Sequence, residues 1–316
     1  MKRICKVCIL AVLLASCMHR STANASPQSF ALEPCIKVSD SELCQTVDKS
    51  LSELSGIVAH SSEKDVFWVH NDQGAPKIYA INAAGKVLTT VTLNTMDFDD
   101  AEDISLGDGP EAGRKYLYVG DIGKSRKKAG TVKIFRFKEP LAGELANSEI
   151  SINDPQLIRL KYSENKEIDF ETQLIDPITG DLFLIQKDKF KVFKAKHSDL
   201  MASNEVLGSG SLQLLEVRDN GSWDGKLSGG AVSPDGSEIL VRSATQAWLF
   251  ARSAGQTIDQ ALEKPFLTIS LEKEFNGEAI TFDNLGMDFF TVSENLKKEE
   301  NNTADPQPVF HYKRLN

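Results

Sequence analysis

The amino-acid sequence predicts an all-β protein, a five-bladed β-propeller of four-stranded antiparallel blades, from three observations. The composition is that of an ordinary globular protein, with 41% hydrophobic and 26% charged residues. One unit of short apolar strands recurs along the chain, starting at residues 55, 102, 171, 229 and 278. Turns rich in Gly, Asp, Asn and Pro join these strands, and no sustained helical periodicity interrupts them. Four-stranded units repeated around an axis form a propeller.

The first two strands of each unit carry the clearest pattern. The first strand opens on a small or acidic residue and continues with apolar residues. A tight turn and a second apolar strand follow, and this strand ends in polar residues. The expected second strands are 66–69, 116–119, 182–185, 239–241 and 289–292. The long interval between Glu102 and Glu171 leaves a sixth blade open as an alternative.

Two further strands complete each unit. The expected third strands are 78–81, 132–135, 192–193, 248–250 and 309–312. The expected fourth strands are 87–93, 157–160, 212–217 and 266–271. The fifth unit ends after its third strand, so we expect the segment 30–36 to supply the missing outer strand. That closure would join the two ends of the chain and remove two open sheet edges.

Short motifs at the strand starts resemble a known family. They are Glu53–Gly56, Asp100–Glu102, Asp169–Glu171, Ser228–Ala231 and Gly277–Ala279, with Ser293-Glu294 ending the last second strand. This succession resembles the SdiA-regulated propeller family and, more distantly, the phytase-like and lactonase-like propellers. The resemblance implies a small exported propeller with Glu at the starts of inner strands, and Asn71, Asp121, Lys187 and Glu294 at matching second-strand ends. It assigns no reaction. The chain departs from the family in longer loops at 121–131 and 295–307, and at Arg242.

A column of carboxylates is the first candidate site. Glu102, Glu171 and Glu278 start three inner strands, which line the axis of a propeller, and Ser55 and Gly229 fill the column in the other two blades. Converging carboxylates repel one another, so either a cation neutralises them or a pKa is raised. Oxygen ligands alone favour Ca²⁺ or Mg²⁺, and we expect Ca²⁺. The alternatives are that each Glu only bonds the neighbouring blade, or that the column contacts a substrate or acts in catalysis directly. The surrounding acidic run 97–103 is expected to be solvated except for Glu102.

The polar ends of the second strands form a second candidate ring at the same mouth. Its members are His70, Asn71, Asp72, Asp121, Lys187, Arg242 and Glu294. We expect Asp121 or His70 to act as a general base. The other five are expected to bind ligand, with Lys187 and Arg242 holding an anion. The alternative is that these cations pair with the carboxylate column, and that His70 is a hydrogen-bonded strand-end residue.

The N-terminal residues are typical of an export signal. Lys2, Arg3 and Lys6 precede an apolar stretch too short to span a bilayer. Leu14 to Cys17 is similar to a bacterial lipobox, in which Cys17 becomes the lipidated first residue. Cleavage after Ala25 is the alternative. We therefore expect a signal peptide over 1–16, a tether with the closing strand over 17–50, and the propeller over 51–316.

Two cysteines remain beyond the lipobox. Cys35 and Cys44 form an even pair in an oxidising compartment, which predicts a disulfide between them. The expected location is the bacterial cell envelope, lipid-anchored and facing the periplasm or the cell surface. A soluble periplasmic or secreted protein is the alternative. We expect a monomer that contacts the membrane only through its lipid.

The charge and the motifs narrow the function without naming a reaction. A formal net charge of -9 argues against nucleic acid as a partner. The sequence contains no H-E-x-x-H and no G-x-S-x-G motif. Three functions remain: Ca²⁺-assisted hydrolysis or binding of a small anionic or ester ligand, a non-catalytic module that binds a protein or glycan, and a glycoside hydrolase using two carboxylates. Whether the protein is an enzyme is left open.

Overall fold

The computed structural model describes most of the predicted propeller. The described residues are 29–33, 37–38, 41–42, 48, 50–124, 130–163, 167–202, 212–213, 215–221, 225–294 and 308–315. The expected signal peptide, the lipidated Cys17 and the expected Cys35–Cys44 disulfide lie outside them. Within the described ranges, no helix has the length and apolar character needed to cross a membrane.

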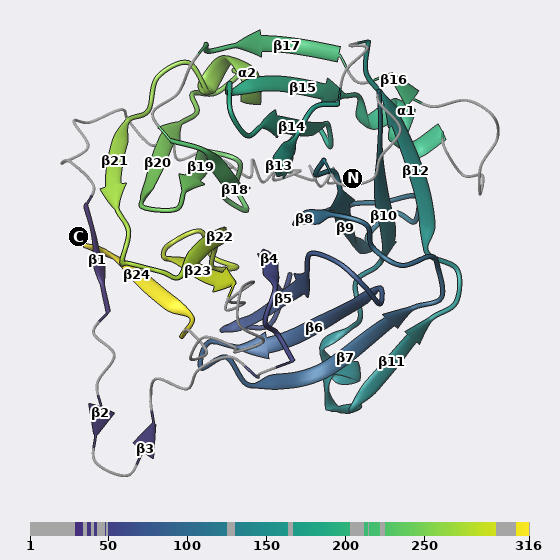
Figure 1. Ribbon diagram of the computed structural model, residues 1–316, viewed down its shortest axis with the longest axis vertical. Helices are drawn as coiled ribbons and strands as arrows, with labels where there is room; N and C mark the ends of the chain where they lie inside the picture. Colours follow the sequence, from purple (N-terminus) through teal and green to yellow (C-terminus); the bar gives the residue numbers. More distant parts are fainter. Residues whose placement is uncertain are drawn as a thin grey trace, which may run out of the picture.

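Five sheets of four or five strands stand around a common axis, so the protein is an all-β, five-bladed propeller (Figure 1). The inner strands are β4 (Leu54–Ala59), β8 (Ala101–Asp108), β13 (Phe170–Ile175), β18 (Leu227–Val232) and β22 (Asn276–Phe282). The second strands are β5 (Val66–Asn71), β9 (Lys115–Asp121), β14 (Leu182–Gln186), β19 (Glu238–Ser243) and β23 (Phe289–Glu294). The third strands are β6 (Lys77–Asn82), β10 (Thr131–Lys138), β15 (Lys191–Ala195), β20 (Gln246–Ala251) and β24 (Phe310–Leu315). The fourth strands are β7 (Val87–Leu93), β12 (Gln156–Lys161), β17 (Leu215–Asp219), β21 (Leu267–Ser270) and β1 (Ser29–Leu32).

The long interval between Glu102 and Glu171 holds no sixth blade in its described part. Beyond the four strands of blade two it contains the 3₁₀ helix η1 (Ala142–Ala146) and β11 (Glu149–Ile152). Strand β11 pairs in parallel with β7 and extends blade one. The expected strand 212–217 is divided in the same manner. Strand β16 (Leu212–Gln213) pairs in parallel with β12 of blade two, and only β17 belongs to blade three. Each added strand thus covers the outer edge of the preceding blade.

The N-terminal strand β1 closes the fifth blade, beside the C-terminal strand β24 (Figure 1). Phe30 packs its ring 5.0 Å from that of Phe289, and the Arg314 guanidinium lies 4.7 Å from the Phe30 ring centre. A hairpin of β2 (Lys37–Val38) and β3 (Ser41–Glu42) follows β1. Two short helices, α1 (His197–Ala202) and α2 (Ile258–Ala261), lie in the connections of blades three and four.

Apolar side chains between neighbouring blades form the core. Phe67 of blade one lies 4.6 Å, ring centre to ring centre, from Phe290 of blade five. Trp68 is fully buried in the cluster between blades one and two. Burial of such aromatic residues between sheets provides most of the favourable free energy of packing.

All five blades carry a β-bulge at the same point of the inner strand. The pairing of the inner with the second strand slips by one residue there, and the skipped residues are Ser55, Glu102, Glu171, Ser228 and Glu278. A bulge turns a side chain away from the regular alternation of the strand. The column member in blade four is therefore Ser228, one residue before the expected Gly229.

Candidate functional site

The three glutamates of the column come together at one mouth of the propeller. Glu171 is 2% exposed, Glu102 is 9% exposed and Glu278 is half-buried. Burial raises the pKa of Glu102 well above its ordinary value, and the charges of Glu171 and Glu278 raise it further. Burial, followed by the repulsion of Glu171, raises the pKa of Glu278 to about 8. These mutual effects require carboxylates from blades two, three and five to be close neighbours.

A tighter acidic group lies within this mouth. Ligand oxygens of Asp100, Glu102 and Asp169 all lie within 4.8 Å of one another. Asp100 and Asp169 each stand two residues before a column glutamate, in the segments that lead into β8 and β13. The structure thus groups Glu102 with two aspartates rather than with Glu171 and Glu278, the other two predicted metal ligands.

Gly123 leaves the space in which this acidic group sits. A Cβ built on Gly123 would lie 2.0 Å from Glu102 Oε1 and 2.3 Å from Asp100 Oδ2. The loop after β9 therefore presents bare backbone to both carboxylates. Three hard oxygen donors in such a cradle suit a divalent cation of the Ca²⁺ or Mg²⁺ type.

Lys187 is the cation of this mouth. Its Nζ lies 2.5 Å from Glu171 Oε1, and the side chain is 28% exposed. Burial lowers the pKa of Lys187, but Glu171, Glu278 and Asp169 outweigh burial and raise it overall. The ammonium offsets part of the negative charge while keeping one side open to solvent.

Glu294, a predicted ligand-binding residue, lies beside Glu278. The Asn276 side-chain amide donates to Glu278 Oε1 at 2.5 Å and to Glu294 Oε2 at 2.6 Å. This amide holds the carboxylates of β22 and β23 at a common edge of the mouth.

Arg242 is not available for a ligand, contrary to the prediction. Its side chain is fully buried and forms an ion pair with Glu274, which is also fully buried. The same guanidinium donates to the carbonyl oxygens of Ala279 (2.8 Å) and Ser243 (3.1 Å). A Cβ on Gly277 would lie 2.0 Å from one of its nitrogens, so glycine is required where the chain passes the guanidinium. This buried ion pair holds blades four and five together.

Asp121 is a positioning residue rather than the predicted general base. Its side chain is fully buried, Oδ2 pairs with Lys133 Nζ at 2.8 Å, and Oδ1 accepts the Asp100 backbone N–H at 3.0 Å. It therefore holds the loop that carries Asp100. Its burial separates it from any ligand at the mouth.

His70 is likewise misplaced for base catalysis. The ring is fully buried, and its Nδ1–H donates to the Asn71 carbonyl oxygen at 3.0 Å. Burial lowers its pKa to about 4. The ring lies over Gly56 and 6.2 Å, centre to centre, from the Phe98 ring, so it packs between blades one and two instead of facing the mouth.

Asn71 and Asp72 connect loops on the blade-one side. The Asn71 amide donates to the Ser50 carbonyl oxygen at 3.0 Å. Asp72 bonds through its backbone to Glu53 and Ala101, and its Oδ2 accepts from Gln73 at 3.1 Å. Both residues shape the approach to the mouth, and neither belongs to the acidic group.

The serine members of the column support the blade-bonding alternative. Ser55 Oγ donates to both Glu102 O and Glu102 Oε2 at 3.2 Å, and Ser228 Oγ donates to Gly277 O at 2.9 Å. The serines of the column therefore bond neighbouring blades to one another, while its glutamates place negative charge at the mouth.

Asp103 is the important residue that sequence reasoning missed. It is 1% exposed, although it lies in the acidic run expected to be solvated. Its carboxylate accepts the backbone N–H groups of Ile104 (2.8 Å) and Gln173 (2.9 Å), and that of Gly230 also reaches it. Blades two, three and four are thus joined beneath the carboxylate mouth. An acidic residue placed directly before an apolar strand was the available signal.

Similarity to known proteins is found among solved structures. No protein-family model matches the sequence. No curated protein matches it. Among solved structures, the chain is similar to a gluconolactonase from Xanthomonas campestris that is described as important in glucose secondary metabolic pathways. The two are 13% identical with a TM-score of 0.46, over 87% of this chain and 81% of that chain. Fold and site together define a five-bladed propeller with a carboxylate-rich axial mouth.

Proposed function

We propose that this protein binds a divalent cation, with Ca²⁺ as the best match, and hydrolyses a small ester or lactone at the carboxylate mouth. One observation carries the proposal: the oxygens of Asp100, Glu102 and Asp169 lie within 4.8 Å of one another. The lactonase-like and SdiA-regulated resemblance of the strand starts is consistent with such a site and assigns no residue to it.

The charge balance of the mouth supports a cation. Burial raises the pKa values of Glu102, Glu171 and Asp169, so each carboxylate is held where its charge is unfavourable. The charge of Lys187 acts against this rise at all three carboxylates, and its ammonium pairs directly with Glu171. When bound, Ca²⁺ would neutralise this charge and polarise the carbonyl oxygen of a ligand.

The remaining residues of the mouth have separate roles in the proposed reaction. Lys187 would attract the carbonyl oxygen or an anionic group of the ligand through its exposed side. Glu278, with a pKa raised to about 8, keeps its proton at neutral pH. Water adds to the acyl carbon and the acyl C–O bond breaks. Glu278 would give its proton to the departing alkoxide, and the proton released by the added water would return to the Glu278 carboxylate. Asn276 would fix the Glu278 carboxyl by the bond described above.

Titration of the purified protein with Ca²⁺ tests the proposal directly. We expect Ca²⁺ to bind with 1:1 stoichiometry by calorimetry and to raise the melting temperature. At a free Ca²⁺ concentration of 100 times the Kd, the free energy of unfolding would rise by about 2.7 kcal/mol, which is the gain expected from binding. Asp169→Asn should abolish the gain. Glu111→Gln, which alters an exposed carboxylate of blade two outside the acidic group, is the control. Absence of bound ion and of any melting shift would refute the cation site.

A substrate screen separates catalysis from binding. Nitrophenyl esters and five- and six-membered lactones should be hydrolysed in the presence of Ca²⁺, and Glu278→Gln should lower turnover more than cation affinity. Stoichiometric Ca²⁺ without turnover of any ester would favour the non-catalytic binding module instead.

We also propose that the chain is exported and lipid-anchored through Cys17, that Cys35 and Cys44 form a disulfide, and that the body is monomeric. Export and the lipid anchor are supported by the charged and apolar N-terminal pattern that ends in Leu14 to Cys17. Labelling with a fatty-acid analogue should mark the wild type but not Cys17→Ala. Labelling that survives the substitution would contradict the anchor.

A further inference from the structure

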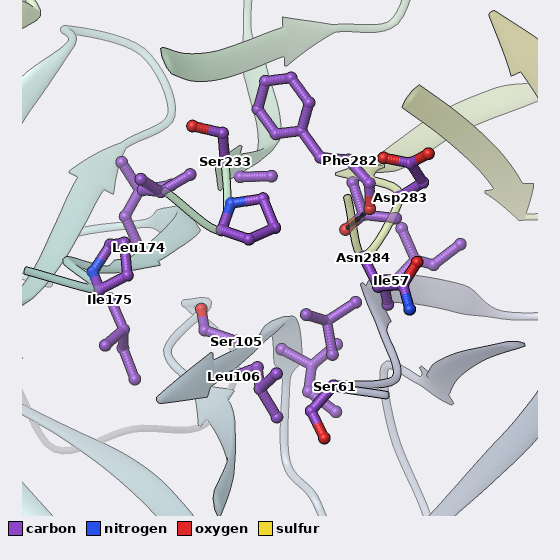
Figure 2. Close-up of a pocket in the computed structure, with 18 of the residues that line it drawn as sticks. Ile57, Ser61, Ser105, Leu106, Leu174, Ile175, Ser233, Phe282, Asp283 and Asn284 are labelled. Carbon is purple, nitrogen blue, oxygen red and sulfur yellow. Dashed lines mark hydrogen bonds between the residues drawn. The ribbon is translucent and has the colours of Figure 1, made fainter. Parts of the chain in front are cut away.

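A cavity of about 170 Å³ lies at the opposite end of the inner strands from the carboxylate mouth. All five blades line it with the ends of their inner strands and the turns that follow. The lining residues are 57–61, 104–106, 115, 173–175, 177, 230–234 and 281–284. Figure 2 shows the labelled side chains arranged around an open centre. Because Asp103 bonds three blades between the two ends, this cavity is a separate site.

The cavity wall is mainly apolar. Ile57, Leu106, Leu174, Ile175 and Phe282 supply much of it (Figure 2). The rim continues this character. Ile178 and Leu285, which follow lining residues in two of the turns, are 65% and 69% exposed. Apolar side chains exposed around a concave site favour an apolar ligand.

Most polar groups of the lining are already engaged. Ser105 Oγ donates to Gln173 O at 2.8 Å, and Ser233 Oγ donates to Asp235 Oδ1 at 2.7 Å. The charged lining residues are engaged as well: Lys115 Nζ pairs with Asp108 Oδ1 at 2.7 Å, and Asp283 Oδ1 accepts the Met287 N–H at the same distance. An anionic ligand would therefore find Lys115, the cation of the lining, already paired with Asp108.

Three lining residues hold buried polar atoms without a protein partner. They are His60 Nε2, Gln173 Oε1 and Asn284 Oδ1. His60 Nδ1 accepts the N–H groups of Ser62 (3.1 Å) and Glu63 (3.2 Å). A neutral ring that accepts at Nδ1 carries its proton on Nε2, so this bonding pattern assigns a donor there. The lining thus has one unused donor, at His60, and two unused acceptors, at Gln173 and Asn284, each costly to leave unpaired.

We propose that this cavity binds a small, neutral, mainly apolar molecule that carries one hydroxyl group, of the size of a phenol. A hydroxyl group can accept from His60 Nε2–H or donate to Asn284 Oδ1. The volume agrees, since an apolar cavity of about 150 Å³ holds benzene. The aliphatic wall surrounds the ring and disfavours an ion, and Lys115, the cation of the lining, is already paired with Asp108.

Calorimetric titration of the full-length protein with phenol and with toluene tests this site. Phenol should bind 1:1 with a Kd at or below about 1 mM, and about five- to tenfold more tightly than toluene, as one hydrogen-bonded group predicts. Asn284→Leu should remove most of this preference while keeping toluene binding. Glu102→Gln should leave both affinities unchanged, which separates the result from the proposed cation site.

A blocking variant locates the bound molecule. Ser61 lies at the exposed edge of the cavity, so Ser61→Trp should cover the opening and weaken phenol binding at least tenfold without disturbing the core. Ser151→Trp, at an exposed position on β11, is the matched control. A wild-type Kd for phenol above about 10 mM would show that the cavity holds only water. That result, or unchanged binding in Ser61→Trp, overturns the proposal.

Discussion

Asp121 Oδ2 lies 2.8 Å from Lys133 Nζ, so a buried ion pair on blade two supports the loop that presents Asp100. The other oxygen of Asp121 receives the Asp100 backbone N–H. A residue that resembled a catalytic base in the sequence therefore acts on the site through a second aspartate. Its removal should be felt in cation affinity as well as in stability.

Asp121→Ala should weaken Ca²⁺ binding about tenfold, because the Asp100 loop loses its anchor. It should also lower the free energy of unfolding by about 1–3 kcal/mol, since Lys133 is left partly buried without its partner. Calorimetry and urea denaturation measure the two effects. Asp108→Asn, which breaks an exposed pair of the same blade, should change stability by less than about 1 kcal/mol. Equal cation affinity in Asp121→Ala and wild type would contradict the positioning role.

Gly123→Ala should abolish cation binding while leaving the propeller folded. The new methyl group would displace the carboxylates of Glu102 and Asp100, which lie 2.0 and 2.3 Å from its position. The comparison is Gly143→Ala, where nothing lies within 4 Å of the added Cβ. Circular dichroism and Ca²⁺ titration of both variants measure fold and affinity. Normal affinity in Gly123→Ala would show that the cation binds elsewhere.

Arg242→Met should destabilise the protein by about 3–5 kcal/mol, because it leaves the Glu274 carboxylate buried and unpaired. The double variant Arg242→Met/Glu274→Gln should recover a large part of that loss, since it removes the isolated charge. Denaturation of the two single variants and the double variant gives the coupling free energy. If Arg242→Met instead kept wild-type stability and lost only ligand affinity, Arg242 would be the anion-binding residue that its sequence context predicted.

Stability should depend on pH through His70. The pKa of the folded state, about 4, lies below the ordinary value of 6.5. The unfolded chain therefore takes up this proton first as the pH falls. The stabilisation is complete above pH 6.5 and is lost between pH 6.5 and 4, by roughly 3 kcal/mol in total. The difference in unfolding free energy between wild type and His70→Gln isolates this effect. A difference that does not change over this range would mean that His70 is not buried as a neutral ring.

Local patterns in the sequence were sufficient for the architecture. The five strand starts predicted the inner strands β4, β8, β13, β18 and β22 within about two residues, because alternation and turn residues act over short stretches of chain. The same patterns placed Glu102, Glu171 and Glu278 at one mouth, since equivalent positions of radial repeats must meet near the axis. Strand β1 pairs where the missing edge of blade five required a partner.

Contacts between distant strands decided the roles of the polar residues. Arg242 pairs with Glu274, Asp121 with Lys133, and Asp103 bonds residues of blades three and four. No pattern within one unit specifies these partners, because each lies on another strand or another blade. The one-residue bulge at Glu102 also gives neighbouring residues different surroundings. The Glu102 side chain faces the mouth, whereas Asp103, the next residue, is buried between the blades. The repeat therefore determined the blades and the charged column, while packing between the blades decided which charges are buried in pairs and which remain for a ligand.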